Sequence, residues 1–460
     1  MADLGDRTAD DVDAPDPEIE QARALVHQGR NAEAIESLLA TVKARPGFAG
    51  AYSMLGSILR FEGEIDAAIA AHRQAIACDP ARAEAYSCLG AALCDRGELD
   101  AAIEAHRQAI ALGANGAGAY APLAAALLAK GEIEPAREMT AAALARNPTD
   151  APAHFTLARL RLLDGDLRRG WEEYEWRTRP GVMWRTVRAF PCPPWQGEDP
   201  LGRTLLLHAE QGLGDTIQFV RFAARLEAAG ARLVLEVQPP LAGLIARSFP
   251  CAQVLRKGEP LPPVDFHCPL GSLPHRFDIG LDQLPGPVPY LVPDPAAVAE
   301  WRRRLGGLGG LKIGIAWAGN PAYQADHARS FAPGRVAALI AALSRPGITL
   351  FALQKDPRPE DRAALAAAAG QVLDLSAVVG DFDHTGAIAT ALDLIVSTDT
   401  SLPHLTGALG LPTWLLLPRV PDWRWLLDRP DTPWYPSLRL FRQQQAGDWD
   451  GVLAALAAAL

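Results

Sequence analysis

Only six of the 460 residues are cysteines, and no two of them form a CxxC pair. Because their sequence surroundings are mostly apolar, we expect buried free thiols rather than a disulfide framework or a zinc site. The chain also lacks any window approaching the ~20 consecutive apolar residues that a membrane-spanning helix requires. Its N-terminus is acidic, whereas a signal peptide begins with a basic region followed by an apolar one. These absences predict a soluble, cytoplasmic protein with no transmembrane segment.

An excess of positive charge is missing too: 44 lysines and arginines stand against 54 aspartates and glutamates, a formal net charge of -10. Residues 1–20 hold eight carboxylates and one arginine, a balance of -7, so the remainder of the chain is close to neutral. Without a broad basic face, we expect no nucleic-acid partner. Residues 1–14 are expected to form a disordered acidic tail. The length allows about two to four domains.

The first third of the chain repeats itself with a period of 34 residues. Glycines recur at this spacing; a small residue follows each of them after five residues, and proline follows most of them after seventeen. The glycines are Gly29, Gly63, Gly97, Gly131 and Gly165, the small residues are Ala34, Ala68, Ala102, Ala136 and Gly170, and the prolines are Pro46, Pro80 and Pro148. The pattern predicts paired antiparallel helices, since glycine ends the first helix and proline the second. Such pairs bury their apolar faces only by stacking, which builds a solenoid.

In these positions the sequence resembles the tetratricopeptide-repeat family, over an array of about five repeats at residues 15–184. The resemblance implies a concave face that binds a peptide or protein partner; the alternatives are a rigid spacer and a dimerisation surface. His72 and His106 hold equivalent places in two repeats, so we interpret them as packing residues rather than ligands. The last repeat is irregular, and the aromatic residues of its 171–176 stretch are expected to cap the array and dock it on the next domain.

Related O-linked N-acetylglucosamine transferases grip peptide backbone with an asparagine ladder along the inner helices. The matching positions here hold Met54, Cys88 and Pro122. The ladder is therefore absent, and the same grip is not expected.

After a proline-rich connector at residues 190–200, short apolar runs alternate with helical stretches, which predicts βαβ units with parallel sheets. We expect a first Rossmann-like lobe over 200–285, a second over 311–445 and a C-terminal helix over 446–460. The fold class is thus α plus α/β: a helical solenoid followed by a two-lobed region, which suggests the GT-B architecture. The expected strands are 205–208 and 233–237 in the first lobe, and 312–317, 348–353, 372–375, 394–397 and 412–417 in the second; the expected helices include 216–229, 334–344 and 384–392.

Ligands of open parallel sheets bind outside the carboxyl ends of the strands, and polar residues gather at those positions in the second lobe. These residues are Gly319, Asn320, Arg329, Ser330, Gln354, Lys355, Asp399, Thr400, Ser401 and His404. Their convergence predicts a binding site.

Two motifs have a functional and a structural interpretation. Gly212 and Gly214 let backbone approach a ligand, and the free N–H groups of the following helix can hold an anion; alternatively, Asp215 simply caps that helix. In the stretch 399–404, hydroxyls and N–H groups at a strand-to-helix turn suit a diphosphate, and Asp399 suits sugar hydroxyls. Alternatively, these residues simply cap the helix, and the histidine makes its hydrogen bonds within the protein.

The stretches 212–215, 319–330 and 399–404 together resemble the heptosyltransferase-like glycosyltransferases of family 9, most closely bacterial proteins that join tetratricopeptide repeats to such a region. The resemblance implies that Asp215 is the catalytic base and that Arg329 replaces the lysine that contacts donor phosphates. It also implies that Asp399, Thr400 and His404 bind the donor, while Ser401 stands where those enzymes have glycine.

The implied reaction is a direct, inverting displacement at the anomeric carbon, with a nucleotide sugar as substrate and no cofactor. Arg329, Lys355 and the turn at Thr400 and Ser401 would stabilise the departing phosphate. No metal is needed. Although Asp381 and Asp383 resemble the Asp-x-Asp motif of metal-dependent transferases, Asp383 suits the N-cap of the next helix, so we expect no metal site there.

Two further segments carry distinctive composition. The glycine-rich stretch 306–310 precedes a strand instead of following one and is interpreted as a linker. The segments Trp423–Trp425 and Trp434–Tyr435 place aromatics beside an arginine; they either stack on a base or sugar ring or fold back onto the first lobe.

The leading hypothesis is a bacterial glycosyltransferase whose repeat array recruits a protein acceptor, such as flagellin or another surface protein. One alternative is a transferase of polysaccharide or lipopolysaccharide assembly. The other is a catalytically inactive repeat adaptor that binds partner proteins.

Overall fold

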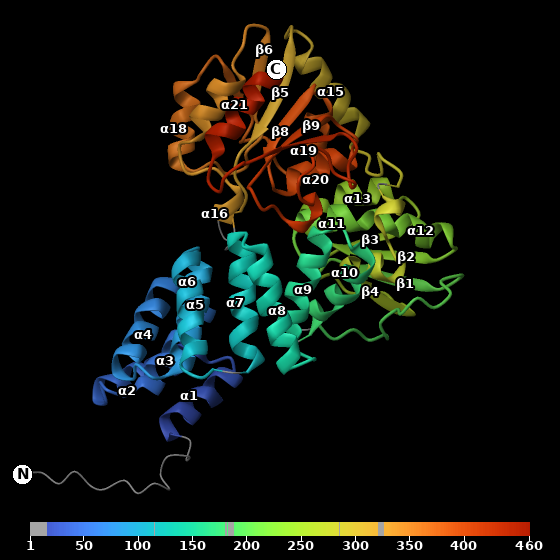
Figure 1. The fold of residues 1–460 in the computed structure, drawn as a ribbon. Helices are drawn as coiled ribbons and strands as arrows, with labels where there is room; N and C mark the ends of the chain where they lie inside the picture. The colour runs from blue at the N-terminus through green and yellow to red at the C-terminus, as the bar shows by residue number, and fades with distance from the viewer. Residues whose placement is uncertain (1–15, 115, 180–181, 183–187, 285, 321–325) are drawn as a thin grey trace, which may run out of the picture. The chain divides into compact units, whose positions relative to one another are not determined.

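The computed structural model describes residues 16–114, 116–179, 182, 188–284, 286–320 and 326–460 (Figure 1). The acidic tail expected at 1–14 lies outside the described residues. The chain divides into two compact units, Met1–Thr156 and Leu157–Leu460. Within the described part of the chain, no helix is long and apolar enough to cross a membrane.

The first unit is built from helices that pack against their neighbours in sequence order (Figure 1). They are α1 (Pro17–His27), α2 (Asn31–Ala44), α3 (Ala49–Phe61), α4 (Ile65–Cys78), α5 (Ala83–Arg96), α6 (Leu99–Ala111), α7 (Ala117–Lys130), α8 (Ile133–Arg146) and the start of α9 (Ala151–Leu163). Each recurring glycine has a positive φ, as at Gly97 (85°) and Gly131 (89°), a backbone conformation that glycine adopts without steric cost. Ala34, Ala68 and Ala102 are fully buried where paired helices meet. The expected helix pairs are confirmed.

His72 and His106 are packing residues, as the repeat register predicts. Their exposed fractions are 0% and 1%. A Cβ added to Gly56 would lie 2.6 Å from Cε1 of His72, and one added to Gly90 would lie 2.6 Å from Cε1 of His106. Each imidazole therefore fills space that its glycine leaves open. Burial lowers the pKa of each histidine to about 4.

The boundary between the two units falls inside α9, so the second helix of the irregular last repeat belongs to the second unit. Its helix α10 (Leu167–Tyr174) and the 3₁₀ turn η2 (Glu175–Thr178) contact the α/β region. Trp171 is 1% exposed, donates from Nε1 to the Ile279 carbonyl at 3.1 Å, and meets Phe219 and Trp423 edge to face. Trp171 therefore packs on the α/β region of its own unit, while the expected capping and docking of the array stay predictions.

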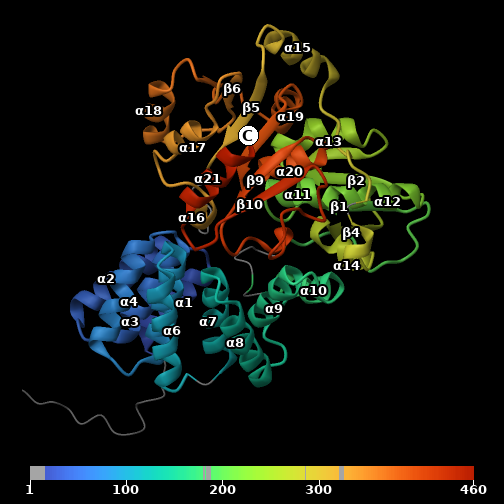
Figure 2. The same ribbon diagram turned by 45° about the horizontal axis from the view of Figure 1, so that its top comes forward.

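The second unit contains two parallel sheets (Figures 1 and 2). The four-stranded sheet has the order β3-β2-β1-β4, and the six-stranded sheet has the order β10-β9-β8-β5-β6-β7. The strands are β1 (Thr204–His208), β2 (Arg232–Val237), β3 (Gln253–Arg256), β4 (Phe266–Pro269), β5 (Leu311–Ala316), β6 (Ile348–Ala352), β7 (Val372–Asp374), β8 (Leu394–Thr398), β9 (Thr413–Leu417) and β10 (Leu438–Arg442). Of these, β3, β4 and β10 were not expected. Because all pairs are parallel, the carboxyl ends of each sheet's strands share one edge.

Helices connect the strands of both sheets. They are α11 (Leu213–Phe219), α12 (Ala223–Ala228), α13 (Ala242–Ser248), α14 (Leu273–Arg276), α15 (Pro295–Leu305), α16 (Asp326–Arg329), α17 (Val336–Leu343), α18 (Pro359–Ala367), α19 (Phe382–Thr390), α20 (Ser401–Ala408) and α21 (Trp449–Ala459), with short 3₁₀ turns η3 (Val220–Phe222), η4 (Pro239–Leu241), η5 (Leu270–Ser272), η6 (Leu281–Gln283) and η7 (Trp423–Trp425). The helix expected at 216–229 was wrong in its start and its continuity. It begins at Leu213 and is interrupted by η3, so Asp215 lies in the helix rather than in the preceding loop.

Candidate functional site

The glycine stretch 212–215 joins β1 to α11, at the carboxyl edge of the first sheet. Gly212 is the N-cap residue, and Asp215 reaches back so that its Oδ2 accepts from the Gly212 N–H at 2.8 Å. Asp215 therefore does stabilise the helix start, although from the third helical position and not as the N-cap. One side of its carboxylate is occupied by this bond.

The other oxygen of Asp215 is bound by Arg424 of η7, which lies 209 residues further along the chain. The Arg424 guanidinium donates from Nη2 to Asp215 Oδ1, from Nη1 to Asp422 Oδ1 at 2.8 Å, and from Nε to Gln218. Arg424 is 8% exposed, so the ion pair is largely removed from water. The segment around Trp423–Trp425 thus folds back onto the first lobe, which confirms the second of the two interpretations above.

The stretch 399–404 follows β8 and opens α20. Thr400 is the N-cap residue, and its hydroxyl accepts from the Leu402 N–H at 3.3 Å, while Ser401 is the first helical residue. Asp399 is 6% exposed. Burial raises the pKa of Asp399 to about 6, with the neighbouring charge of Asp422 acting in the same direction.

His404 lies one turn into α20 and is 5% exposed. Its Nδ1 is 3.0 Å from the hydroxyl of Tyr435, which is itself fully buried. Burial, followed by the positive charge of Arg424, holds the pKa of His404 well below its usual value. The imidazole is therefore neutral at physiological pH.

The glycine stretch and the 399–404 motif touch each other. A Cβ added to Gly214 would lie 2.8 Å from Cδ2 of His404, and α11 and α20 lie side by side in both ribbon views (Figures 1 and 2). Gly214, expected to let backbone approach a ligand, instead lets two helices approach each other.

The loop that follows β5 is organised around Asp326, which sequence reasoning missed. Asp326 is 2% exposed; its Oδ2 accepts from the Ser330 hydroxyl at 2.8 Å, and its Oδ1 is 3.3 Å from Nε of Arg329. The Ser330 hydroxyl in turn accepts from the Gly319 N–H at 2.8 Å. Arg358, from the loop after β6, lies 3.7 Å from the same carboxylate. Two guanidinium groups therefore flank one buried carboxylate; residues 321–325 of this stretch lie outside the described residues, and Asn320 directly precedes them.

Gln354 and Lys355 follow β6 and differ in environment. The Gln354 Oε1 accepts from the backbone N–H groups of Trp317 and Ala318, at 3.1 and 3.0 Å, so this side chain closes the ends of β5 and β6. Lys355 is exposed. Of the two, Lys355 is the one whose side chain faces solvent.

The charges of these loops act on one another. Arg329 and Arg424 both favour the ionised form of Asp399, and both disfavour protonation of His404. Arg329 and Arg424 therefore lie near enough to Asp399 and His404 for their charges to act on both groups.

The Asp381–Asp383 segment has a structural role, but the carboxylate that caps the helix is not the one that the sequence predicted. Asp381, not Asp383, is the N-cap residue of α19 and accepts from the His384 N–H at 2.9 Å. Asp383 instead pairs with Arg247 of α13, with Nη1 2.6 Å from Oδ2, and accepts from the Asp294 N–H at 3.1 Å. Among the described residues, no group of three or more histidine, cysteine, aspartate or glutamate side chains is arranged to hold a metal ion.

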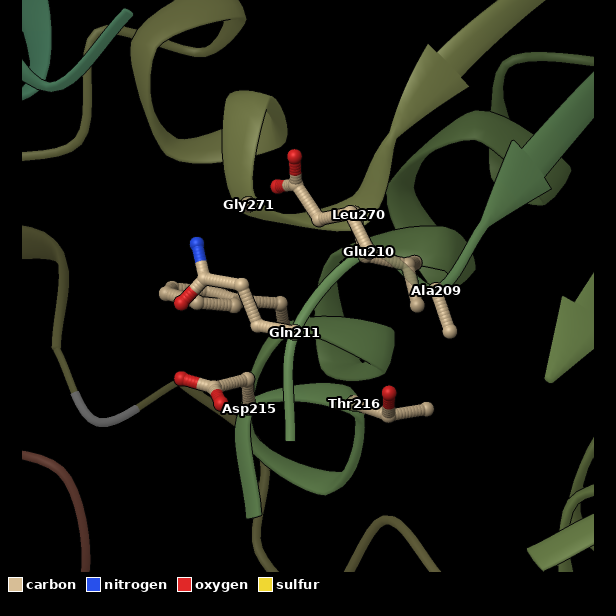
Figure 3. A pocket seen from close by; sticks show the side chains of 8 residues that line it. Ala209, Glu210, Gln211, Asp215, Thr216, Leu270 and Gly271 are labelled. Carbon is tan, nitrogen blue, oxygen red and sulfur yellow. The ribbon is translucent and has the colours of Figure 1, made fainter. Parts of the chain in front are cut away.

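A shallow recess that opens to solvent lies beside Asp215, and the space of about 170 Å³ within it includes the open solvent at its mouth (Figure 3). It is lined by Ala209, Glu210, Gln211, Asp215, Thr216, Phe219, Leu270 and Gly271. Arg177, whose side chain is fully buried, donates to Glu210 Oε1 from Nη2 at 2.6 Å, and the Tyr174 hydroxyl lies 3.0 Å from Oε1 of Gln211. The last repeat therefore anchors the loop that leads into the glycine stretch.

A family model for the tetratricopeptide repeat matches residues 56–94. The N-terminal helices form a tetratricopeptide-repeat array. Protein FlbA of Caulobacter vibrioides is 30% identical in an alignment of 321 residues that covers 64% of this chain and 52% of FlbA. The chain thus spans about half the length of this curated relative.

Several solved structures are similar to part of the chain. MamA is 24% identical, with 35% of this chain and 93% of MamA covered and a TM-score of 0.31. PilW, described as a widely conserved type IV pilus biogenesis factor, is 22% identical, with 35% and 76% covered and a TM-score of 0.33. YrrB, described as a tetratricopeptide-repeat protein with an unusual peptide-binding site, is 18% identical, with 32% and 76% covered and a TM-score of 0.28.

In the tetratricopeptide-repeat array, Met54, Cys88 and Pro122 are half-buried on α3, α5 and α7. The residues that sequence reasoning missed lie in the second unit: Arg177, Glu210, Asp326, Arg358 and Asp422. Arg177 pairs with Glu210, and Arg358 lies near Asp326, in each case between different segments of the chain. Asp326 also bonds to Ser330 in its own loop, and Asp422 bonds to Arg424 two residues away. No motif noted in the sequence marks these residues. The sequence did hold a weak indication for Glu210: together with Gln211 it directly precedes the glycine stretch.

Proposed function

We propose that residues 157–460 form a glycosyltransferase of GT-B type that uses a nucleotide sugar. The observation that supports this most directly is the contact between two loops expected to carry the chemistry. The stretch with Asp215 leaves the first sheet at its carboxyl edge, the motif with Asp399 and His404 leaves the second sheet at its carboxyl edge, and Gly214 packs on His404. Ligands of open parallel sheets bind at such edges.

The roles follow from the chemistry of the side chains. Asp215 would accept the proton of the acceptor hydroxyl, because each oxygen of a carboxylate has a lone pair left after one hydrogen bond. Arg329, Lys355 and the turn at Thr400 and Ser401 would bind the donor phosphates and stabilise charge on the leaving group. Asp399 would bind sugar hydroxyls of the donor. The reaction would be metal-independent and inverting.

The repeat array would recruit a protein acceptor, such as flagellin or another surface protein. Stacked helical repeats present an extended surface that suits a polypeptide better than a single sugar. This part of the proposal rests on the repeats themselves, since the chain matches only about half of its curated relative.

The test uses the purified 460-residue chain and a panel of nucleotide sugars. Donors that bind are found by thermal shift, because a ligand that binds the folded state raises its melting temperature by mass action. We expect one donor to be hydrolysed slowly, and Asp215→Asn to reduce turnover at least 100-fold while the donor-induced shift is kept. Full turnover in Asp215→Asn would contradict the assignment of the base.

A repeat adaptor without turnover is the second candidate, and two observations favour it. The family match lies in the array alone, and both oxygens of Asp215 are already bound within the protein. An adaptor would bind a nucleotide sugar, or a partner protein alone, without releasing sugar. Donor binding with no hydrolysis in the wild-type protein would support it.

A further inference from the structure

The two edges of the His404 ring face different neighbours. On one edge, Nδ1 lies 3.0 Å from the hydroxyl of Tyr435, which is fully buried. On the other edge, Cδ2 and Nε2 lie next to α11, where a Cβ added to Gly214 would be 2.8 Å from Cδ2 and 3.4 Å from Nε2. One ring nitrogen is therefore bound by Tyr435, while the other lies on the edge next to the glycine stretch.

The Tyr435 hydroxyl donates this hydrogen bond, and Nδ1 of His404 accepts it. The imidazole is neutral, so the ring carries one proton, on one of its two nitrogens. A neutral imidazole nitrogen accepts a hydrogen bond more strongly than a phenol oxygen does, and a phenol O–H donates more strongly than an imidazole N–H. The bond to Nδ1 therefore leaves the ring proton on Nε2, since the partner of one nitrogen sets the state of the other.

Tyr290 allows the opposite arrangement, which is less favourable. The hydroxyls of Tyr290 and Tyr435 interact, and the Tyr290 hydroxyl gives its own proton to the Ile217 carbonyl at 3.0 Å. In the opposite arrangement, Nδ1 of His404 would donate to Tyr435, and Tyr435 would donate to Tyr290. That chain uses two phenol oxygens as acceptors in place of the imidazole nitrogen, so it is the weaker set of hydrogen bonds.

A buried guanidinium strengthens Tyr435 as a donor. Arg221 is 8% exposed, and its Cζ lies 5.0 Å from the ring centroid of Tyr435 and 4.4 Å from that of Tyr290. Burial raises the pKa of Tyr435 well above its usual value, whereas the charge of Arg221 acts in the opposite direction and so polarises the O–H bond. The same charge disfavours a second proton on His404.

We infer that Tyr435 is a positioning residue: its hydroxyl holds the proton of His404 on Nε2, so that this nitrogen donates a hydrogen bond to a phosphate oxygen of the nucleoside diphosphate. The phosphate part of the inference rests on the proposed function, whereas the position of the proton does not. A donor fixed in this way needs no reorganisation when negative charge develops on the leaving group. Neither Tyr435 nor His404 gains or loses a proton in this role.

The position of the proton is measured first, on the 460-residue chain labelled with ¹⁵N-histidine. Long-range ¹H–¹⁵N NMR distinguishes a protonated ring nitrogen from an unprotonated one by its chemical shift, and His404→Gln identifies the His404 signals by their loss. We expect Nε2 to be protonated and Nδ1 unprotonated at pH 7 without ligand. A proton on Nδ1 would overturn the inference.

The effect on binding is measured by calorimetric titration with uridine, guanosine, adenosine and cytidine diphosphates. For the one that binds most tightly, we expect Tyr435→Phe to raise the dissociation constant about fivefold or more, the loss of one hydrogen bond to a charged group. Tyr290→Phe is the matched control, because it also removes a buried hydroxyl but keeps the bond to Nδ1. Its dissociation constant should change less than about twofold; equal weakening in both variants would overturn the inference.

A double-mutant cycle separates positioning from a general loss of stability. In the His404→Ala background, Tyr435→Phe should change the dissociation constant less than about twofold, because no ring is left to position. A further fivefold loss in that background would show that Tyr435 acts by another route and would overturn its role.

The failure of this inference is distinguishable from failure of the proposed function. If none of the four diphosphates binds, the proposed function and the phosphate contact are overturned together, while the NMR result still decides which nitrogen carries the proton. If a diphosphate binds and Tyr435→Phe leaves its affinity unchanged, the positioning role is overturned and the transferase stands. Should Tyr435→Phe not fold, the NMR result and the affinity of His404→Ala, which should fall about fivefold or more, decide the question.

Discussion

Asp399 is almost completely buried, and the charged groups around it are Asp422, Arg329 and Arg424. Burial raises its pKa to about 6, whereas the pKa of nearby His404 is far lower. Of these two groups only Asp399 changes its charge just below neutral pH. Its ionised form is the one that accepts hydrogen bonds from sugar hydroxyls.

Donor affinity should therefore fall as the pH falls through 6. We expect the dissociation constant of the donor to rise roughly tenfold between pH 7 and pH 5, because only about a tenth of Asp399 is ionised one unit below its pKa. Isothermal titration calorimetry at several pH values measures this. In Asp399→Asn the affinity should be weak and independent of pH; the wild-type profile in that variant would assign the titration to another group.

The loss of Arg424 should destabilise the second unit. Removing it leaves Asp215 and Asp422 without their shared cation in a partly buried place. Breaking a buried ion pair by removing one partner costs about 3–5 kcal/mol. We expect Arg424→Met to lower the free energy of unfolding by several kcal/mol in urea titrations.

Arg424→Lys should lower the free energy of unfolding less than Arg424→Met does, because the positive charge remains. Some loss is still expected, since one ammonium group cannot span three acceptors as the guanidinium does. Arg302→Met, at an exposed position of α15, is the control and should change stability by less than about 0.5 kcal/mol. Equal losses for Arg424→Met and Arg302→Met would show that the Arg424 bonds contribute nothing net.

At the scale of secondary-structure elements, the array depends on histidines packed against glycines. The pair of Gly56 and His72 joins α3 to α4, and the pair of Gly90 and His106 joins α5 to α6. In both, the imidazole is buried and its pKa is lowered to about 4. The unfolded chain, with a histidine pKa near 6.5, therefore takes up protons before the folded array does.

The array should lose stability as the pH falls from 6.5 towards 4, and the loss should level off below that range. At pH 5 the expected cost is on the order of 2 kcal/mol for each histidine, from the difference between the two pKa values. Urea unfolding of the full chain followed by circular dichroism measures it. The variant with His72→Leu and His106→Leu should show a flatter pH dependence; an unchanged slope would rule these histidines out.

For the whole molecule, the proposed function assigns recruitment to the unit Met1–Thr156 and chemistry to the unit Leu157–Leu460. A chain lacking residues 1–150 keeps α9, α10 and the buried Trp171. We expect it to fold, to bind the donor and to hydrolyse it within about threefold of the rate of the 460-residue chain, but to lose modification of a protein acceptor. Undiminished modification of that acceptor would refute recruitment by the array.

A second truncation at residue 178 is the comparison. It removes Trp171, Tyr174 and Arg177, of which the first fills the aromatic cluster and the other two hold the loop before the glycine stretch. We expect this shorter chain to be insoluble or to melt at a much lower temperature, because it exposes the surface that Trp171 covers.

The sequence predictions were correct where the residues that carry a pattern lie close together in the chain. The 34-residue period placed the helix pairs and identified His72 and His106 as packing residues, because turn glycines and small contact residues act within one repeat. The strands β3, β4 and β10 escaped notice because they lie in segments of weaker apolar pattern. The N-cap of α19 was placed at Asp383 instead of Asp381 because either aspartate, two positions apart, can begin a helix.

By itself the sequence determined the repeat array, the parallel α/β class of the second unit and the gathering of polar residues at strand ends, since these follow from periodicity and from turn chemistry over a few residues. Only the tertiary structure decided the partners: that Arg424 binds Asp215, that Asp326 organises the loop after β5, and that α10 holds the loop before the glycine stretch. Apart from the bonds that Asp326 makes within its own loop, these pairs join different segments of the chain, up to 209 residues apart. Their formation depends on how the folded chain returns on itself, for which no short-range pattern carries information.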